Sequence, residues 1–140
     1  MKRYDSLSPL SRDHHPALIL ARLLRSDAPA YKDLPTQPND KAVYAMQFYQ
    51  GELCSHFEKE ESLLEKCRHV NQQVDILIKE IFEEHKVLSK AFLSLTDQTN
   101  QDEANDQLGK LLEAHIRKEE RVLFPLLQEY FSDEEIKQFI

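Results

Sequence analysis

The chain has 140 residues, a formal net charge of −7 and only two glycines. The acidic balance disfavours a nucleic-acid surface, which needs a basic face, and the shortage of glycine disfavours a turn-rich β fold. No apolar run approaches the roughly 20 residues that span a bilayer, and the N-terminus lacks the apolar stretch of a secretion signal, so we expect one cytoplasmic domain over residues 1–140.

Helix signals follow one another along the chain, separated by polar and proline-containing segments. After an irregular lead-in over residues 1–12, the first helix is expected to begin near Asp13, a good N-cap residue. The expected long helices span residues 13–26, 41–67 and 72–95, and a fourth runs from residue 106 past Pro125, which should bend it. A capping box at residues 132–135 opens a short terminal helix.

Two of the expected helices carry the same pattern, a histidine followed four residues later by a glutamate. The two pairs are His56 with Glu60 and His115 with Glu119. Because four residues make about one helical turn, both side chains of a pair point the same way. Both pairs lie on apolar helix faces, where such groups are costly to bury unless something binds them. The repeated pattern therefore indicates a metal site.

The spacing of the histidines predicts that each long helix supplies one of them to a common layer. The series is His14, His56, His85 and His115. Antiparallel helices joined by a short turn place residues at one height when the residues are equidistant from that turn. The midpoints of successive pairs fall at Pro35, between Val70 and Asn71, and at Asn100. All three lie in expected connections, so we predict an all-α, up-down-up-down four-helix bundle with a short C-terminal helix.

Two adjacent histidines could be the one that the first helix supplies to the layer. Apolar residues such as Ala17 and Leu20 put the apolar face closer to His14, whereas His15 lies nearer two arginines. Pro16 leaves the geometry of the first turn open, so both His14 and His15 remain candidates at this point.

Four histidines and two glutamates in one layer suit two metal ions. Carboxylates from opposing helices bridge such a pair, while the histidines cap each ion on its outer side. This donor set lacks the thiolates of structural zinc and favours iron or manganese, with zinc possible. The two cysteines, Cys54 and Cys67, do not have zinc-finger spacing and are expected to be free thiols.

Several other polar residues are expected to lie outside the ligand set. The glutamates expected to form mostly a solvated acidic face are Glu58, Glu61, Glu83, Glu84, Glu103 and Glu120. Of these, Glu61 or Glu84 is an alternative candidate for supporting a ligand histidine from outside. Tyr49 is interpreted as a core aromatic, or alternatively as a hydrogen-bond donor to an oxygen species, and His69 as a solvated histidine.

The motifs DHHPAL, HFEKEE, the Glu84-His85 pair and HIRKEERVLFP make the chain resemble the hemerythrin-like, HHE cation-binding domain family over about residues 10–130. The resemblance implies an oxo- or hydroxo-bridged pair of iron ions. The implied ligands are His14 or His15, His56, Glu60, His85, His115 and Glu119. Ser89 stands four residues after His85, where oxygen-carrying hemerythrins have a second histidine, so the chain is closer to the HHE branch.

The resemblance implies a non-haem di-iron protein that senses, binds or handles oxygen, nitric oxide or iron. Its expected partner is a small diatomic ligand, with no nucleic acid and no membrane. One alternative is a di-iron oxidoreductase or peroxide-consuming enzyme, because an open coordination position can activate oxygen as well as bind it. Another alternative is an interaction module that the metal merely stabilises.

Overall fold

The computed structural model describes residues 2–140, and over this range the chain is helical with no strand, which confirms the predicted all-α class. The α-helices are α1 (Ser8–Leu24), α2 (Pro38–Phe48), α3 (Cys54–Lys66), α4 (Gln72–Leu93), α5 (Gln101–Lys118), α6 (Phe124–Tyr130) and α7 (Asp133–Phe139). Two π-helical turns, η1 (Tyr49–Leu53) and η3 (Glu119–Leu123), join α2 to α3 and α5 to α6, and the 3-10 turn η2 (Leu95–Asp97) follows α4.

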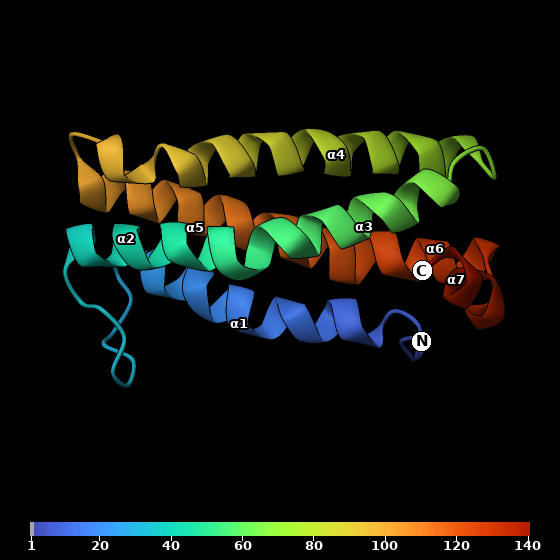
Figure 1. Ribbon diagram of the computed structural model, residues 1–140, viewed down its shortest axis with the longest axis horizontal. Coiled ribbons are helices and arrows are strands. Elements are labelled where there is room, and N and C mark those ends of the chain that lie inside the picture. Colours follow the sequence, from blue (N-terminus) through green and yellow to red (C-terminus); the bar gives the residue numbers. More distant parts are fainter. Residues whose placement is uncertain (1) are drawn as a thin grey trace.

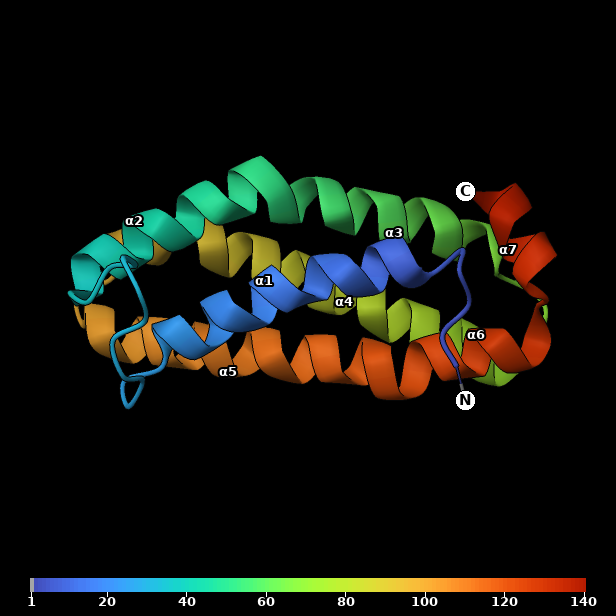
Figure 2. The same cartoon turned by 90° about the horizontal axis from the view of Figure 1, so that it is seen from below.

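The helices form four rods that lie side by side along the long axis of the molecule (Figure 1). The rods are α1, the continuous α2–η1–α3, α4, and the continuous α5–η3–α6. Consecutive rods run in opposite directions, and both chain termini lie at the same end (Figures 1 and 2). The short α7 packs against α3 at that end. Within residues 2–140, no helix has the length and apolar character needed to cross a membrane.

The first rod begins earlier than the sequence predicts. The helix α1 starts at Ser8 instead of near Asp13, so part of the expected irregular lead-in is helical. Pro9 stands in its first turn, where the missing N–H costs little, and Pro16 lies inside the helix. Asp13 does not cap α1, because it lies inside the helix, where its carboxylate faces the ring of His56.

The fourth rod also begins earlier than predicted, at Gln101 instead of after Asn105. The side chain of Asn100 caps α5 by accepting a hydrogen bond from the backbone N–H of Glu103. Asn105 is buried, and its side-chain amide donates to the carbonyl oxygen of Pro38 at 2.9 Å. This buried amide ties the start of α5 to the start of α2.

The predicted starts of α4 and α7 are confirmed, and α4 ends at Leu93, two residues before the expected end. Asn71 caps α4, and Ser132 and Glu135 form the predicted capping box at the start of α7. Pro125 lies in the first turn of α6, directly after the π-helical turn η3. The irregular part of the fourth rod is therefore the π-helical turn just before the proline. Pro125 has no N–H group, so one hydrogen bond to that turn is missing.

The buried interior consists of two apolar clusters separated by a layer of polar side chains. One cluster includes Leu24, Ala45, Phe57, Phe92 and Leu112, and the other includes Leu10, Leu64, Ile78, Leu123 and Leu127. The polar layer between them comprises His14, His56, Glu60, His85, His115 and Glu119, each at most 3% exposed. Every rod contributes to both clusters, so the polar layer crosses the whole interior.

The close approach of α1 to α5 depends on Gly109. A Cβ at this position would lie 2.5 Å from the carbonyl oxygen of Ala21 and 3.1 Å from Cβ of Leu24. We expect Gly109→Ala to lower the free energy of unfolding by about 1–3 kcal/mol, because the α1 backbone must shift. A Cβ at Gly51 would meet nothing within 4 Å, so Gly51→Ala should be neutral or stabilising by up to about 1 kcal/mol. Urea unfolding of both variants tests this contrast, and equal free energies of unfolding would contradict it.

Candidate metal centre

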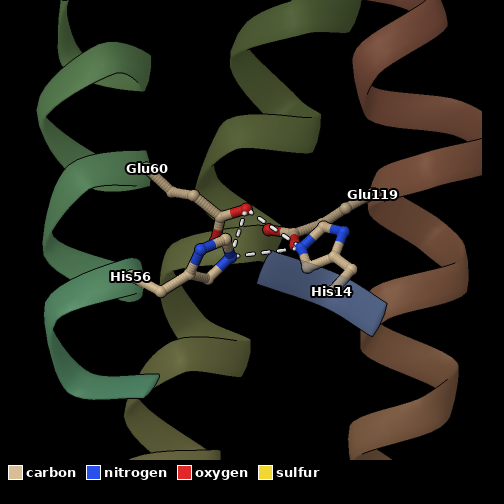
Figure 3. A group of neighbouring side chains, drawn as sticks. All are labelled: His14, His56, Glu60 and Glu119. Carbon is tan, nitrogen blue, oxygen red and sulfur yellow. Dashed lines mark hydrogen bonds and ion pairs between the residues drawn. The ribbon is translucent and has the colours of Figure 1, made fainter. Parts of the chain in front are cut away.

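The six side chains of the polar layer converge from all four rods. The histidines come from α1, α3, α4 and α5, Glu60 comes from α3, and Glu119 is the first residue of η3. Figure 3 shows four of these side chains, with His56 and Glu60 on one rod facing His14 and Glu119 on two others. The structure thus brings together all the predicted site residues except His15.

One half of the polar layer, which we call subsite A, is formed by His14 and His56 together with one oxygen of each glutamate. The Nε2 atom of His14 lies 3.0 Å from Oε1 of Glu119 and 3.5 Å from Oε2 of Glu60. The Nε2 atom of His56 lies 3.1 Å from the same Oε2 of Glu60. The two Nε2 atoms are 3.1 Å apart, so both imidazoles face one small volume.

The other half, subsite B, is formed by His85 and His115 with the remaining glutamate oxygens. The Nε2 atom of His85 lies 3.2 Å from Oε1 of Glu60 and 3.7 Å from Oε2 of Glu119. The Nε2 atom of His115 lies 3.4 Å from Oε2 of Glu119. Each glutamate therefore directs one oxygen to each subsite, which is the arrangement that bridges two metal ions.

The donor atoms of the layer fit metal ions and are poorly satisfied by the protein itself. Among the described residues, none of the four oxygens of Glu60 and Glu119 accepts a hydrogen bond, and Nε2 of His85 and of His115 also has no partner. Buried carboxylates are costly unless positive charge lies beside them, and either protonated histidines or a bound metal ion can supply that charge. Imidazole nitrogen and carboxylate oxygen are donors that iron, manganese and zinc accept.

The outer nitrogen of each histidine ring faces a carboxylate beyond the layer. The Nδ1-to-oxygen distances are 2.6 Å for His14 and Glu120, 3.0 Å for His56 and Asp13, 2.7 Å for His85 and Glu61, and 2.7 Å for His115 and Glu84. Each carboxylate accepts a hydrogen bond from the Nδ1–H group, which directs Nε2 toward a metal and fixes the orientation of the ring. All four Nε2 atoms consequently point inward.

The structure shows more carboxylates supporting the histidines than the sequence predicted. Of the expected acidic face, Glu61 and Glu84 do support ligand histidines, as the alternative interpretation allowed. Glu120 also does so, although we expected it to be solvated, and Asp13 does so although we expected it to cap a helix. A helical wheel places these residues at the edge of the apolar face, where it does not distinguish a solvated carboxylate from a supporting one.

The remaining candidates lie outside the polar layer. His15 is exposed on α1 and belongs to neither subsite, whereas His14 is 3% exposed and belongs to subsite A. His69 is exposed in the connection after α3. Tyr49 packs in the apolar interior, stacked on Phe92 with ring centroids 5.2 Å apart, as expected of a core aromatic.

Two aromatic rings cover the histidines from the apolar side. The ring of Phe57 stacks on His85 with centroids 4.1 Å apart, and the ring of Phe124 stacks on His14 at 5.9 Å. Both phenylalanines are buried, at 5% and 1% exposure. They keep water from the faces of the two imidazoles and restrict rotation of the rings.

Burial lowers the pKa values of the layer histidines, but the carboxylates of Glu119 and Glu60 outweigh it. The pKa of His14 is raised to about 11, that of His85 to about 10 and that of His115 to about 9. Conversely, burial raises the pKa values of Glu60 and Glu119, but the histidines hold both below their ordinary value. In the metal-free protein, protons on the histidines therefore balance the two buried carboxylates.

Metal binding must displace these protons, so its pH dependence should extend well above neutrality. Because the pKa values of His14, His85 and His115 are raised to between about 9 and 11, a metal ion competes with a proton at each ring throughout the neutral range. We expect the apparent affinity to rise about tenfold per pH unit for each proton displaced. Competition against a chromophoric chelator at pH 6, 7 and 8 measures this, and an affinity that stops rising above pH 7 would contradict it.

Of three comparisons with known proteins, one found a match. Among curated proteins and among solved structures, no match was found. A family model described as the hemerythrin HHE cation-binding domain matches residues 5–127, a range that includes the six layer residues and their four supporting carboxylates. This match confirms the resemblance seen in the sequence motifs. The chain therefore belongs to the hemerythrin HHE cation-binding domain family.

Proposed function

We propose that this chain is a cytoplasmic, single-domain, non-haem di-iron protein that senses, binds or handles oxygen, nitric oxide or iron. Its scaffold would be an up-down-up-down four-helix bundle. The observation that carries the proposal is the division of Glu60 and Glu119, each with one oxygen toward each two-histidine subsite. A single ion would not require carboxylates shared in this way. The free thiols of Cys54 and Cys67 suit a reducing compartment.

Each residue of the layer has a definite role in this proposal. His14 and His56 would hold an ion in subsite A, His85 and His115 would hold one in subsite B, and Glu60 and Glu119 would each give one oxygen to both subsites. Iron would supply redox chemistry and coordination positions for a small ligand. The outer carboxylates keep a proton on each Nδ1 atom, so the histidines bind as neutral imidazoles through Nε2.

The ligand that reaches the ions is expected to be small. Each subsite offers four protein donor atoms, two from imidazoles and two from carboxylates, which leaves positions open on an iron ion that prefers more ligands. The layer residues are at most 3% exposed, and Phe57 and Phe124 close their apolar side. Diatomic molecules such as oxygen and nitric oxide suit such a buried volume, whereas a bulky organic substrate does not.

Anaerobic loading with ferrous iron tests the proposal. We expect two irons per chain by elemental analysis, and a near-ultraviolet charge-transfer band whose shape changes on addition of oxygen or nitric oxide. Manganese and zinc are loaded in parallel, since the same donors accept them. His69→Ala, which changes a histidine remote from the layer, should behave like the unchanged protein. Less than one iron per chain with no such band would refute the proposal.

A further inference from the structure

The N-terminal strap, which we define as residues 2–7, is fastened to the fourth rod beside subsite A. The side-chain oxygen of Gln128 accepts from the backbone N–H of Tyr4 at 2.8 Å, and its side-chain nitrogen donates to the carbonyl of Lys2 at 2.9 Å. The hydroxyl of Tyr4 lies 3.0 Å from the carbonyl oxygen of Gln128. Gln128 is 6% exposed, and its bonds to Lys2 and Tyr4 hold Arg3 between two anchored neighbours.

Arg3 contacts two groups that hold the ring of His14. Its Nη2 atom donates to the backbone carbonyl of Glu120 at 2.7 Å and lies 3.1 Å from that residue's carboxylate. Its guanidinium lies 5.2 Å from the ring centroid of Phe124, which is a cation–π contact. The Glu120 carboxylate binds Nδ1 of His14, and the Phe124 ring stacks on its imidazole. Ser11 donates to the same carboxylate at 2.9 Å.

The four outer carboxylates differ in whether a cation accompanies them. Glu120 is paired with Arg3, and Glu84 is paired with Lys118 at 2.7 Å. Among the ion pairs of residues 2–140, Glu61 and Asp13 have only their histidines as partners. Each subsite therefore contains one histidine whose supporting carboxylate is fixed by a cation and one whose carboxylate is not. This division is the same in both halves of the layer.

We propose that Arg3 is a positioning residue for subsite A. By fixing the Glu120 carboxylate and the Phe124 ring, it sets the orientation of His14 and so the retention of the ion that His14 and His56 share. The N-terminal strap is then part of the metal centre, although it supplies no ligand. Lys118 has the corresponding role for His115 in subsite B. This inference rests on the proposed function, since it assigns a role toward the ions of that site.

Zinc is the probe for the first experiment, because it accepts the same donors and is diamagnetic. Outer-shell partners of metal ligands typically contribute about 10–100-fold in metal affinity. Arg3 acts on His14 through Glu120, one contact further from the ion, so we expect Arg3→Gln to speed the release of one of the two zinc ions to a chelator by up to about 10-fold, and to leave the other unchanged. Arg3→Lys, which keeps the positive charge, should restore part of the retention. Lys118→Gln should speed the release of the other ion.

The imidazole Nδ1–H signals supply a second readout that needs no metal. In nitrogen-15 NMR spectra of the metal-free protein, we expect Arg3→Gln to speed solvent exchange of the His14 Nδ1 proton, because its acceptor is no longer held. The His115 signal should not change in that variant, and it should change in Lys118→Gln. A purely structural role of the strap would instead alter all four histidine signals together.

Arg68 offers a matched control. Its guanidinium lies 5.1 Å from the ring centroid of Phe82 and its Nε atom 3.0 Å from Glu65, so it makes the same kinds of contact away from the layer. Arg68→Gln should leave zinc release and the His14 signal unchanged. The inference is overturned if Arg3→Gln matches the unchanged protein in both readouts, or if Arg68→Gln reproduces its effects. If iron loading gives less than one iron per chain and no charge-transfer band, the proposed function fails, while the His14 signal of the metal-free protein still decides the role of Arg3.

Discussion

Glu119→Ala is expected to bind at most one metal ion per chain under conditions in which the unchanged protein binds two. The Glu119 carboxylate is fully buried and reaches both subsites, with Oε1 3.0 Å from Nε2 of His14 and Oε2 3.4 Å from Nε2 of His115. Its removal takes one oxygen donor from each ion and one of the two bridges between them. Each subsite then keeps two histidines and a single oxygen of Glu60.

The expected loss of metal affinity can be judged from changes at groups that hold a ligand without touching the metal. Loss of an outer-shell partner costs about 10–100-fold in affinity, so loss of a direct donor to both ions should cost more than about 100-fold for at least one of them. Elemental analysis after dialysis gives the metal count, and magnetic measurements on the iron-loaded protein report coupling between the ions.

Glu58→Ala is the matched control for this prediction, because Glu58 is an exposed glutamate on α3. This variant should retain both ions and their coupling. A Glu119→Ala protein that kept two irons with unchanged magnetic coupling would refute the bridging role of this carboxylate.

Metal loading is expected to raise the free energy of unfolding by about 4 kcal/mol for each ion supplied at 1,000 times its dissociation constant. The folded chain presents both subsites, whereas the unfolded chain has no assembled site. Each kcal/mol should raise Tm by about 2–4 °C for a chain of roughly this size. Thermal unfolding with excess zinc and with a chelator measures the difference.

The same thermal unfolding experiment can be repeated at several pH values. In the metal-free protein, the raised pKa values of the layer histidines mean that their protonation stabilises the fold. This contribution is present below their ordinary pKa and is lost as pH rises through about 9 to 11. The stabilisation by metal should therefore be largest at alkaline pH. A double variant, Glu60→Ala with Glu119→Ala, should lose most of the metal-dependent shift, and an unchanged shift there would contradict the assignment.

The sequence was enough to predict that the six layer residues lie together, because helices have a constant rise per residue. Counting from the connections placed one histidine of each rod at one height, and the repeated His-x3-Glu pattern placed both glutamates beside them. The structure brings these six side chains together. The choice of His14 over His15 needed the structure, because Pro16 is inside α1 instead of in its first turn.

Most contacts around the layer and the irregular turns of the helices could not be predicted from the sequence. Arg3 and Glu120 are 117 positions apart in sequence, and no local pattern connects two residues so distant. The π-helical turns η1 and η3 were not predicted, since a π turn differs from an α turn by one residue and leaves the composition of the helix unchanged. The start of α1 was misplaced because Asp13 has the composition of a cap but uses its carboxylate to hold His56.

The polar layer between the two apolar clusters also limits how the rods can be aligned. Sliding one rod by a single turn, about 5.4 Å, would move its histidine or glutamate among leucines of a neighbouring cluster and bring an aliphatic residue into the layer. An ionisable side chain buried without partners costs several kcal/mol, whereas leucines exchanged within a cluster cost far less. The apolar clusters alone would tolerate several neighbouring alignments. The charged layer therefore selects a single vertical alignment of the four rods before any metal is present.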